Sequence, residues 1–266
     1  MIPNILSIAG SDPSGGAGIQ ADIKAISANG GYAMAVITGL TAQNTTGVRR
    51  VELVSPGMVA DQVAALREDI RIDAVKIGML GDAAIIRAVA GALEGLAAPI
   101  VLDTVMVAKG GDRLLASDAV AALRGKLLPR ADVITPNLPE AAALLDRPEA
   151  RDMDAMRAQA QALRALGAGA VLLKGGHLSG RNSPDLLLSA AGETLLDGPR
   201  HATRNTHGTG CTLSAALATL LGHGQPLEQA AREAKAYVGQ AIAASDALEV
   251  GRGHGPTHHF HALWPG

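Results

Sequence analysis

The stretch NTHGTGC, residues 205–211, is a glycine-rich loop that ends at the only cysteine of the chain and leads into an apolar helical pattern. Amide N–H groups at a helix N-terminus have no partner within the helix and bind anions, and glycines let a ligand approach them closely. The spacing therefore predicts an anion site at Gly208, Thr209 and Gly210, with Cys211 beside it.

Several interpretations of Cys211 remain open at this point. A helix N-terminus should lower the pKa of the thiol, which favours a reactive group or a group beside a phosphate. A nucleophile needs a positioned base, and His207 is four residues away without a recognisable oxyanion partner. A zinc site needs several soft ligands, and the chain has one cysteine. Packing at the start of the helix is the remaining alternative.

Three further positions have the chemistry of phosphoryl transfer. Asn137 and Glu140 stand three residues apart at a helix start, where an amide oxygen and a carboxylate suit a Mg²⁺ ion carried by phosphates. The same pair also fits a helix-capping box, and the spacing favours neither. Asp103 ends one strand-like run as a second acid. Lys174 ends another, where a cation near an anion loop favours a phosphate contact over a solvated lysine.

A second glycine-rich loop, GSDPSGGAGIQAD at residues 10–22, follows a strand-like run and opens a helix. Its G-x-G-x-x-A pattern begins six residues after Gly10, whereas a dinucleotide-binding turn directly follows its strand. We therefore expect a substrate loop, with a plain flexible loop as the alternative. The sequence contains no Walker A pattern, which argues against a P-loop nucleoside triphosphatase.

These residues are distributed along a regular alternation of short apolar runs and helical patterns. The apolar runs are continuous, as in strands buried on both faces, and the βαβα order predicts a mostly parallel sheet with helices on both faces. A hairpin turning at Ala191 and Gly192 adds an antiparallel edge, and two long helices follow from about 209 and 227. Helix-start signals are Ser55, which precedes a proline, and Ser117. Strand-like runs occupy residues 4–10, 33–39, 74–80, 99–104, 132–136 and 170–176, and helical patterns occupy 18–31, 55–70, 82–96 and 117–128.

Composition limits the class of protein. Apolar residues make up 48% of the 266, aromatic residues 2%, and the net charge is −2, so we expect one domain, 1–266, with an aliphatic core. The dispersed charge argues against a nucleic acid or membrane partner. One cysteine excludes an intramolecular disulfide and suggests a reducing compartment. The sequence predicts neither a signal peptide nor a membrane-spanning helix, and we therefore expect a soluble cytoplasmic protein.

The same residues resemble the hydroxymethylpyrimidine/phosphomethylpyrimidine kinase branch of the ribokinase-like superfamily, which belongs to thiamine biosynthesis. The resemblance rests on separated segments that cover nearly the whole chain. It implies a three-layer α/β/α fold, ATP and Mg²⁺ as cofactors, and a homodimer. Because the chain extends little beyond the first and last of these segments, we expect no fused thiamine-phosphate synthase domain. The segments are IAGSDPSGGAGIQADIKA, TAQNTTGV, KIGML, VLDTVMVAKGG, ITPNLPEAAALL, LLKGGH, NTHGTGCTLSAALA and GPTHHFHALW.

The resemblance also implies roles for individual residues. Cys211 occupies the base position, where many members of the superfamily have aspartate, and Gln43 matches the residue that hydrogen-bonds the pyrimidine. The remaining roles are these: Gly208 and Gly210 with Lys174 at the transferring phosphoryl group; Asn137 and Thr209 at nucleotide phosphates; Asp103 and Glu140 at the metal; Gly10, Asp22, Met79 and Val107 in the substrate pocket.

Two alternatives remain beside this interpretation. A pyridoxal or pyridoxine kinase would have the same fold and chemistry, and a catalytically idle nucleotide or vitamin sensor would have the same scaffold. The sensor would need a broken site, but Asp103, Glu140, Lys174 and Cys211 are all present. The histidine-rich tail at 253–264 receives no role, since such a tract is more often solvated or packed than metal-binding.

Overall fold

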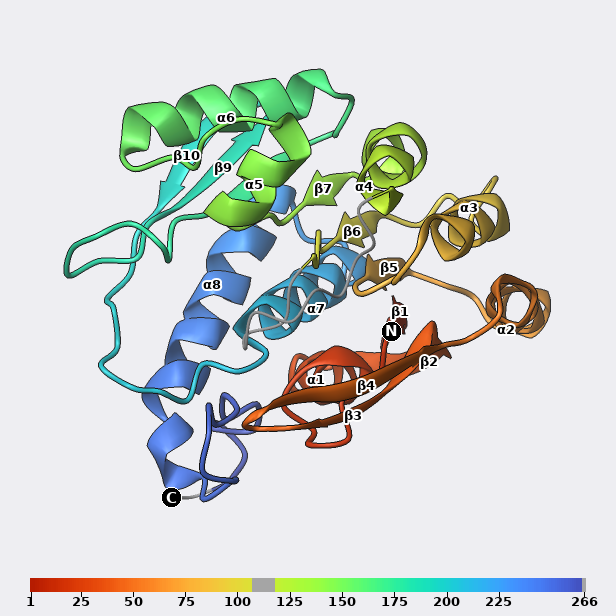
Figure 1. Ribbon diagram of the computed structural model, residues 1–266, viewed down its shortest axis with the longest axis horizontal. Coiled ribbons are helices and arrows are strands. Elements are labelled where there is room, and N and C mark those ends of the chain that lie inside the picture. Colours follow the sequence, from red (N-terminus) through yellow and green to blue (C-terminus); the bar gives the residue numbers. More distant parts are fainter. Residues whose placement is uncertain (107–117, 265–266) are drawn as a thin grey trace.

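The computed structural model describes residues 1–106 and 118–264 and is built around one eight-stranded sheet (Figure 1). The strand order is β10-β9-β8-β7-β6-β5-β1-β2, and all neighbours from β2 to β8 are parallel. β9 pairs antiparallel with both β8 and β10. The strands are β1 Asn4–Ala9, β2 Tyr32–Ile37, β5 Ala74–Ile77, β6 Ile100–Leu102, β7 Val133–Ile134, β8 Val171–Lys174, β9 Asp185–Ser189 and β10 Gly192–Leu196.

Helices cover both faces of this sheet (Figure 1). Successive strand residues point to opposite faces: Ile5 packs with α1, α7 and α8, whereas Leu6 packs with the helices of the other layer. Both cores are aliphatic, as the composition predicts. One layer contains α1 Gly18–Ala28, α7 Thr209–Gly222 and α8 Leu227–Ala243; the other contains α2 Pro56–Asp69, α3 Ala83–Ala92, α4 Ala119–Ala122, α5 Leu138–Leu145 and α6 Met153–Ala165.

The predicted three-layer α/β/α class, with a mostly parallel sheet and an antiparallel edge hairpin, is confirmed. The Ser55 side chain accepts a hydrogen bond from the Met58 amide at the start of α2, as its sequence signal predicts. The helix expected at 117–128 is α-helical only over Ala119–Ala122, and residues Leu123–Leu127 continue it as a π-helix. Ser117 and Val107 lie outside the described residues.

A second, two-stranded sheet was not predicted. Its strands are β3 Gly39–Asn44 and β4 Gly47–Leu53, which pair antiparallel. Residues of β3 alternate between covered and exposed positions and β4 is mostly exposed. These strands therefore lack the continuous apolar signal of the central strands. The hairpin matters for function because it carries Gln43.

Among the residues that the structure describes, no helix has the length and apolar character needed to span a bilayer.

Candidate active site

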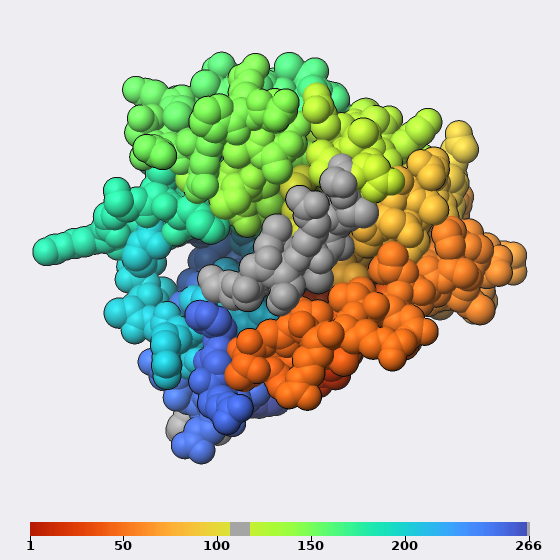
Figure 2. Space-filling view, viewed as in Figure 1, coloured from red at the N-terminus to blue at the C-terminus, as the bar shows by residue number. Residues whose placement is uncertain are grey.

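A cleft of about 1160 Å³ lies beyond the carboxyl ends of the parallel strands. Ligands of open α/β sheets bind at this edge, and the surface is hollowed there beside the segment that follows β10, coloured cyan in Figure 2. The cleft brings together predicted residues from widely separated segments: Gly10, Gln43, Met79, Asp103, Asn137, Glu140, Lys174, Gly208, Thr209, Gly210 and Cys211.

The NTHGTGC loop forms the anion-binding end of this cleft. Gly208 precedes α7 with φ +78°, a conformation that favours glycine, and a Cβ there would overlap the Gly16 carbonyl oxygen. A Cβ on Gly210 would lie 3.2 Å from Lys174 Nζ. Both glycines therefore allow close approaches, and the first turn of α7 faces the cleft beside a lysine.

Asp103, which follows β6, and Lys174, the last residue of β8, form an ion pair, with Nζ 3.2 Å from Oδ1. Asp103 is 2% exposed and also accepts hydrogen bonds from the hydroxyls of Thr135 and Ser214. Burial alone would raise the pKa of Asp103, but Lys174 and Lys76 outweigh it and lower that pKa. Asp103 is therefore an ionised acid beside the anion site.

Asn137 and Glu140 form a complete capping box at the start of α5. Asn137 Oδ1 accepts from the Glu140 amide at 2.8 Å, and Glu140 Oε2 accepts from the Asn137 amide at 2.9 Å. The hydroxyl of Thr104 donates to the same Oε2. Burial raises the pKa of Glu140, although Lys174 opposes this rise. The capping interpretation of the pair is thus confirmed, and a metal role must coexist with it.

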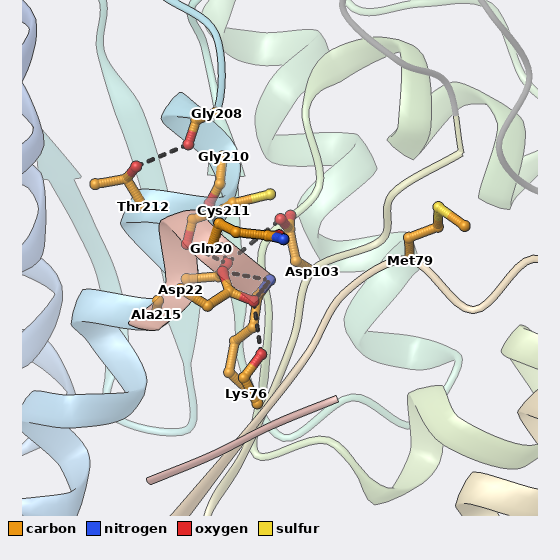
Figure 3. Close-up of polar contacts among 12 residues, drawn as sticks. Gln20, Asp22, Lys76, Met79, Asp103, Gly208, Gly210, Cys211, Thr212 and Ala215 are labelled. Atoms are coloured by element: carbon orange, nitrogen blue, oxygen red, sulfur yellow. Dashed lines mark hydrogen bonds and ion pairs between the residues drawn. The ribbon is translucent and has the colours of Figure 1, made fainter. Parts of the chain in front are cut away.

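Asp22, which the resemblance predicts in the substrate pocket, lies beneath the cleft rather than in its lining. Its side chain is fully buried, and its two carboxylate oxygens accept from Lys76 Nζ at 2.9 and 2.8 Å (Figure 3). Ser7 Oγ donates to it at 2.6 Å. An ionised carboxylate without partners would be too costly to bury there. Asp22 therefore neutralises Lys76 and is not available to a ligand.

Lys76 itself was missed as a functional residue. It comes from β5, is 0% exposed and borders the cleft. Burial alone would lower its pKa, but the nearby carboxylates, Asp22 above all and then Asp103, outweigh burial and raise it. A lysine inside the apolar run AVKIGML was the signal in the sequence, since buried lysines are almost always paired.

The expectation of a lowered thiol pKa at Cys211 was wrong. Burial raises the pKa of Cys211 to about 11; Lys76 opposes this rise, and the negative charges of Asp22 and Asp103 add to it. The helix N-terminus favours a thiolate, but desolvation and two nearby carboxylates outweigh that effect. Cys211 is a half-buried residue that lines the cleft.

Sequence reasoning also missed a polar cluster where the NTHGTGC loop meets the 10–22 loop and β3. His207 Nε2 lies 2.7 Å from Asp12 Oδ2 and 3.3 Å from the amide nitrogen of Gln43. The backbone of the tail holds this loop, because the His207 amide donates to the Gly255 carbonyl. His259 Nε2 further contacts Thr212 Oγ1 on α7 at 3.0 Å. The histidine-rich tail is therefore a packed end that supports the anion loop.

A model of the phosphomethylpyrimidine kinase family matches residues 12–258. The chain belongs to this family. Hydroxymethylpyrimidine/phosphomethylpyrimidine kinase of Escherichia coli is 55% identical over 262 residues, which cover 98% of each chain. This confirms the resemblance found in the sequence motifs.

Solved structures agree with the fold of this phosphomethylpyrimidine kinase family member. Pyridoxal kinase of Bacillus subtilis, solved as an ADP complex, matches with a TM-score of 0.91 and 35% identity over 98% of this chain and 99% of that one. Phosphomethylpyrimidine kinase of Clostridium difficile matches with a TM-score of 0.80 and 39% identity over 90% of this chain and 99% of that one.

Proposed function

We propose that the protein phosphorylates 4-amino-5-hydroxymethyl-2-methylpyrimidine with ATP, first to the monophosphate and then to the diphosphate, in thiamine biosynthesis. The observation that carries this proposal is the 55% identity to the Escherichia coli enzyme over 98% of both chains. The cleft supports it, because Gln43 and the first turn of α7 both line it and suit a polar ring and a phosphoryl group respectively.

Phosphoryl transfer requires mainly alignment and charge neutralisation. We assign Lys174 and the amides of Gly208 and Gly210 to the transferring group, and Asn137 and Thr209 to nucleotide phosphates. These assignments use groups that the fold already brings to one cleft.

The carboxylates of the cleft suit a Mg²⁺ ion. The ion commonly uses one or two carboxylates together with phosphate oxygens and water, and Asp103 and Glu140 offer two buried carboxylates. Within residues 1–106 and 118–264, no three His, Cys, Asp or Glu side chains group as a metal site, so a metal here would depend on phosphate ligands. When bound, Mg²⁺ would neutralise charge on the phosphates.

The substrate end would recognise the ring. We assign Gln43 to hydrogen bonds with the pyrimidine and Gly10 and Met79 to its packing. A Cβ on Gly10 would lie 3.0 Å from the end of the Met79 side chain, so a larger residue at position 10 would crowd this wall of the cleft. Val107 remains assigned to the pocket from resemblance.

Cys211 is assigned as the base for the alcohol. An attacking alcohol must lose its proton, and a positioned base contributes about 10²–10⁴-fold. The raised pKa of the thiol means that Cys211 is protonated at neutral pH, so it must lose this proton before it can accept the proton of the alcohol. Lys76 is the nearby cation that favours its thiolate.

The test is a product assay with ATP, Mg²⁺ and either hydroxymethylpyrimidine or pyridoxal as acceptor. Faster phosphorylation of hydroxymethylpyrimidine, followed by diphosphate formation, is expected. Pyridoxal kinase activity is the second candidate, because the Bacillus subtilis pyridoxal kinase superposes closely on this chain. Turnover of pyridoxal alone would favour that activity, and turnover of neither would favour a sensor.

Three further assignments accompany this function. We propose a single kinase domain over residues 1–266 and a homodimer, both from family resemblance, and a cytoplasmic location from the single cysteine. Sedimentation of the purified protein tests the dimer.

A further inference from the structure

Three polar side chains from distant segments meet at the substrate end of the cleft. Asp12 comes from the 10–22 loop, His207 from the loop before α7, and Gln43 from β3. Asp12 is 2% and His207 7% exposed, and all three line the cleft. The proposed function uses only Gln43, so the buried pair behind it needs its own explanation.

Asp12 is the hydrogen-bond acceptor of this cluster. Its Oδ1 accepts from the amide and hydroxyl of Ser14, and its Oδ2 accepts from the Ala17 amide at 2.8 Å. Burial opposes ionisation, but the bonds from His207 and Ser14 outweigh it and lower the pKa of Asp12. Because the ionised carboxylate only accepts, the 2.7 Å contact requires His207 Nε2 to carry the proton and donate it.

The protonated ring nitrogen then determines how the Gln43 amide is oriented. Gln43 contacts the same His207 Nε2 at 3.3 Å through its terminal amide. The oxygen and nitrogen of a side-chain amide are assigned from their partners. Here the partner is an N–H group, and two N–H groups cannot bond to each other. The single proton on Nε2 points mainly at Asp12 Oδ2, 2.7 Å away, and Gln43 at 3.3 Å accepts the weaker branch of a shared hydrogen bond. The atom of Gln43 that faces His207 is therefore the amide oxygen. The NH₂ group, on the other side of the same amide carbon, points away from His207.

We propose that His207, held by Asp12, is a positioning residue that fixes the orientation of the Gln43 amide and thereby selects the hydrogen-bonding pattern of the substrate ring. The inference rests on the proposed function of Gln43 as the ring-binding residue. The oriented NH₂ group donates to a ring nitrogen, and the amide oxygen has a second lone pair for a neighbouring exocyclic amine. A 4-aminopyrimidine presents this acceptor–donor pair.

A 4-oxopyrimidine presents the opposite pattern, a ring N–H beside a carbonyl oxygen. Its ring N–H would face the NH₂ group of Gln43, and its carbonyl oxygen would face the amide oxygen of Gln43, so neither pair could form a hydrogen bond. An unrestrained glutamine could rotate its amide by half a turn and bind either ring. His207 removes that freedom, and mismatched buried polar groups are what give a hydrogen-bonding site its discrimination.

The experiment measures kcat/KM for 4-amino-5-hydroxymethyl-2-methylpyrimidine and its 4-oxo analogue in the wild type, His207→Leu and His207→Gln. The wild type should prefer the amino ring, and His207→Leu should lose roughly 10- to 100-fold of that preference, the equivalent of one or two unpaired polar groups. His207→Gln should retain most of it, because its amide nitrogen reaches about as far as Nε2 and donates. The KM for ATP in each variant reports whether the anion loop has moved.

The outcomes separate the two proposals. If the wild type phosphorylates neither pyrimidine, the proposed function fails and the ring selection fails with it. If the wild type prefers the amino ring and His207→Leu keeps that preference, only the present inference is overturned. Long-range ¹H–¹⁵N correlation spectra of the wild type give a measurement that does not depend on a variant. A proton on Nε2 of His207 is expected, and an unprotonated Nε2 would refute the positioning role of His207.

Discussion

Replacing Lys76 by methionine should be among the most destabilising single changes in this protein. Lys76 and Asp22 are both 0% exposed, and the two oxygens of Asp22 receive the ammonium group at 2.8 and 2.9 Å. Methionine fills a similar volume but leaves Asp22 with only the Ser7 hydroxyl. Removing one partner of a buried pair costs about 3–5 kcal/mol, a large share of the roughly 5–15 kcal/mol that stabilises a typical domain.

The loss should depend on pH in a defined direction. Burial raises the pKa of Asp22 and Lys76 opposes that rise, so the pKa of Asp22 rises further in the variant. The unfolded carboxyl ionises near pH ~4, whereas the folded one then stays protonated to higher pH. Because the unfolded state releases the proton first, the stability of Lys76→Met falls as pH rises between these two pKa values. Its deficit against the wild type should therefore be smaller at pH ~4 than at pH ~8.

Urea unfolding followed by circular dichroism, at both pH values, measures this deficit. The matched control is the double variant Asp22→Asn/Lys76→Met, which has the same methionine but no buried charge and should recover more than half of the loss. Two results would refute the reasoning. One is a single-variant loss below about 1 kcal/mol, the range of an ordinary substitution. The other is a double variant no more stable than the single one, which would assign the loss to packing rather than charge.

Three other substitutions separate the roles assigned to the cleft. Glu140→Gln should raise the Mg²⁺ concentration needed for activity and reduce turnover while Tm changes little, because glutamine also serves in a capping box; a large fall in Tm with normal metal dependence would leave only the cap. Gln43→Leu should weaken pyrimidine recognition by roughly 1–3 kcal/mol and leave the KM for ATP unchanged; equal weakening for ATP would contradict its assignment. Cys211→Ala should reduce kcat/KM for the alcohol far more than for the monophosphate, whose phosphate has a second pKa of about 6 and needs no base. Equal losses for both acceptors would make Cys211 a packing residue.

The fold was predictable because its central strands carry a strong local signal. Runs such as AVLLK are continuously apolar and end in a polar residue, which indicates both a buried strand and the edge where ligands bind. The β3–β4 hairpin has no such signal, since its residues alternate or face solvent. Helix α6 was also missed, although its buried residues Met156, Gln159, Ala160 and Leu163 recur at the spacing of an amphipathic helix and Asp152 caps its start.

The sequence by itself determined features that depend on neighbours along the chain. Asn137 and Glu140 form their capping box within one helical turn, and Gly208 adopts the positive φ that its glycine-rich loop requires. The polar residues at strand ends belong to the same class, because a parallel sheet places all such ends at one edge.

Tertiary structure decided the charges and the partners. The Lys76–Asp22 pair joins positions 54 residues apart, and the His207–Asp12 contact joins positions 195 residues apart. The helix N-terminus alone predicted a lowered pKa for Cys211, but burial and two carboxylates from other segments raise it. A pKa or an amide orientation depends on desolvation and on partners within a few ångströms. Only the folded chain brings those partners together.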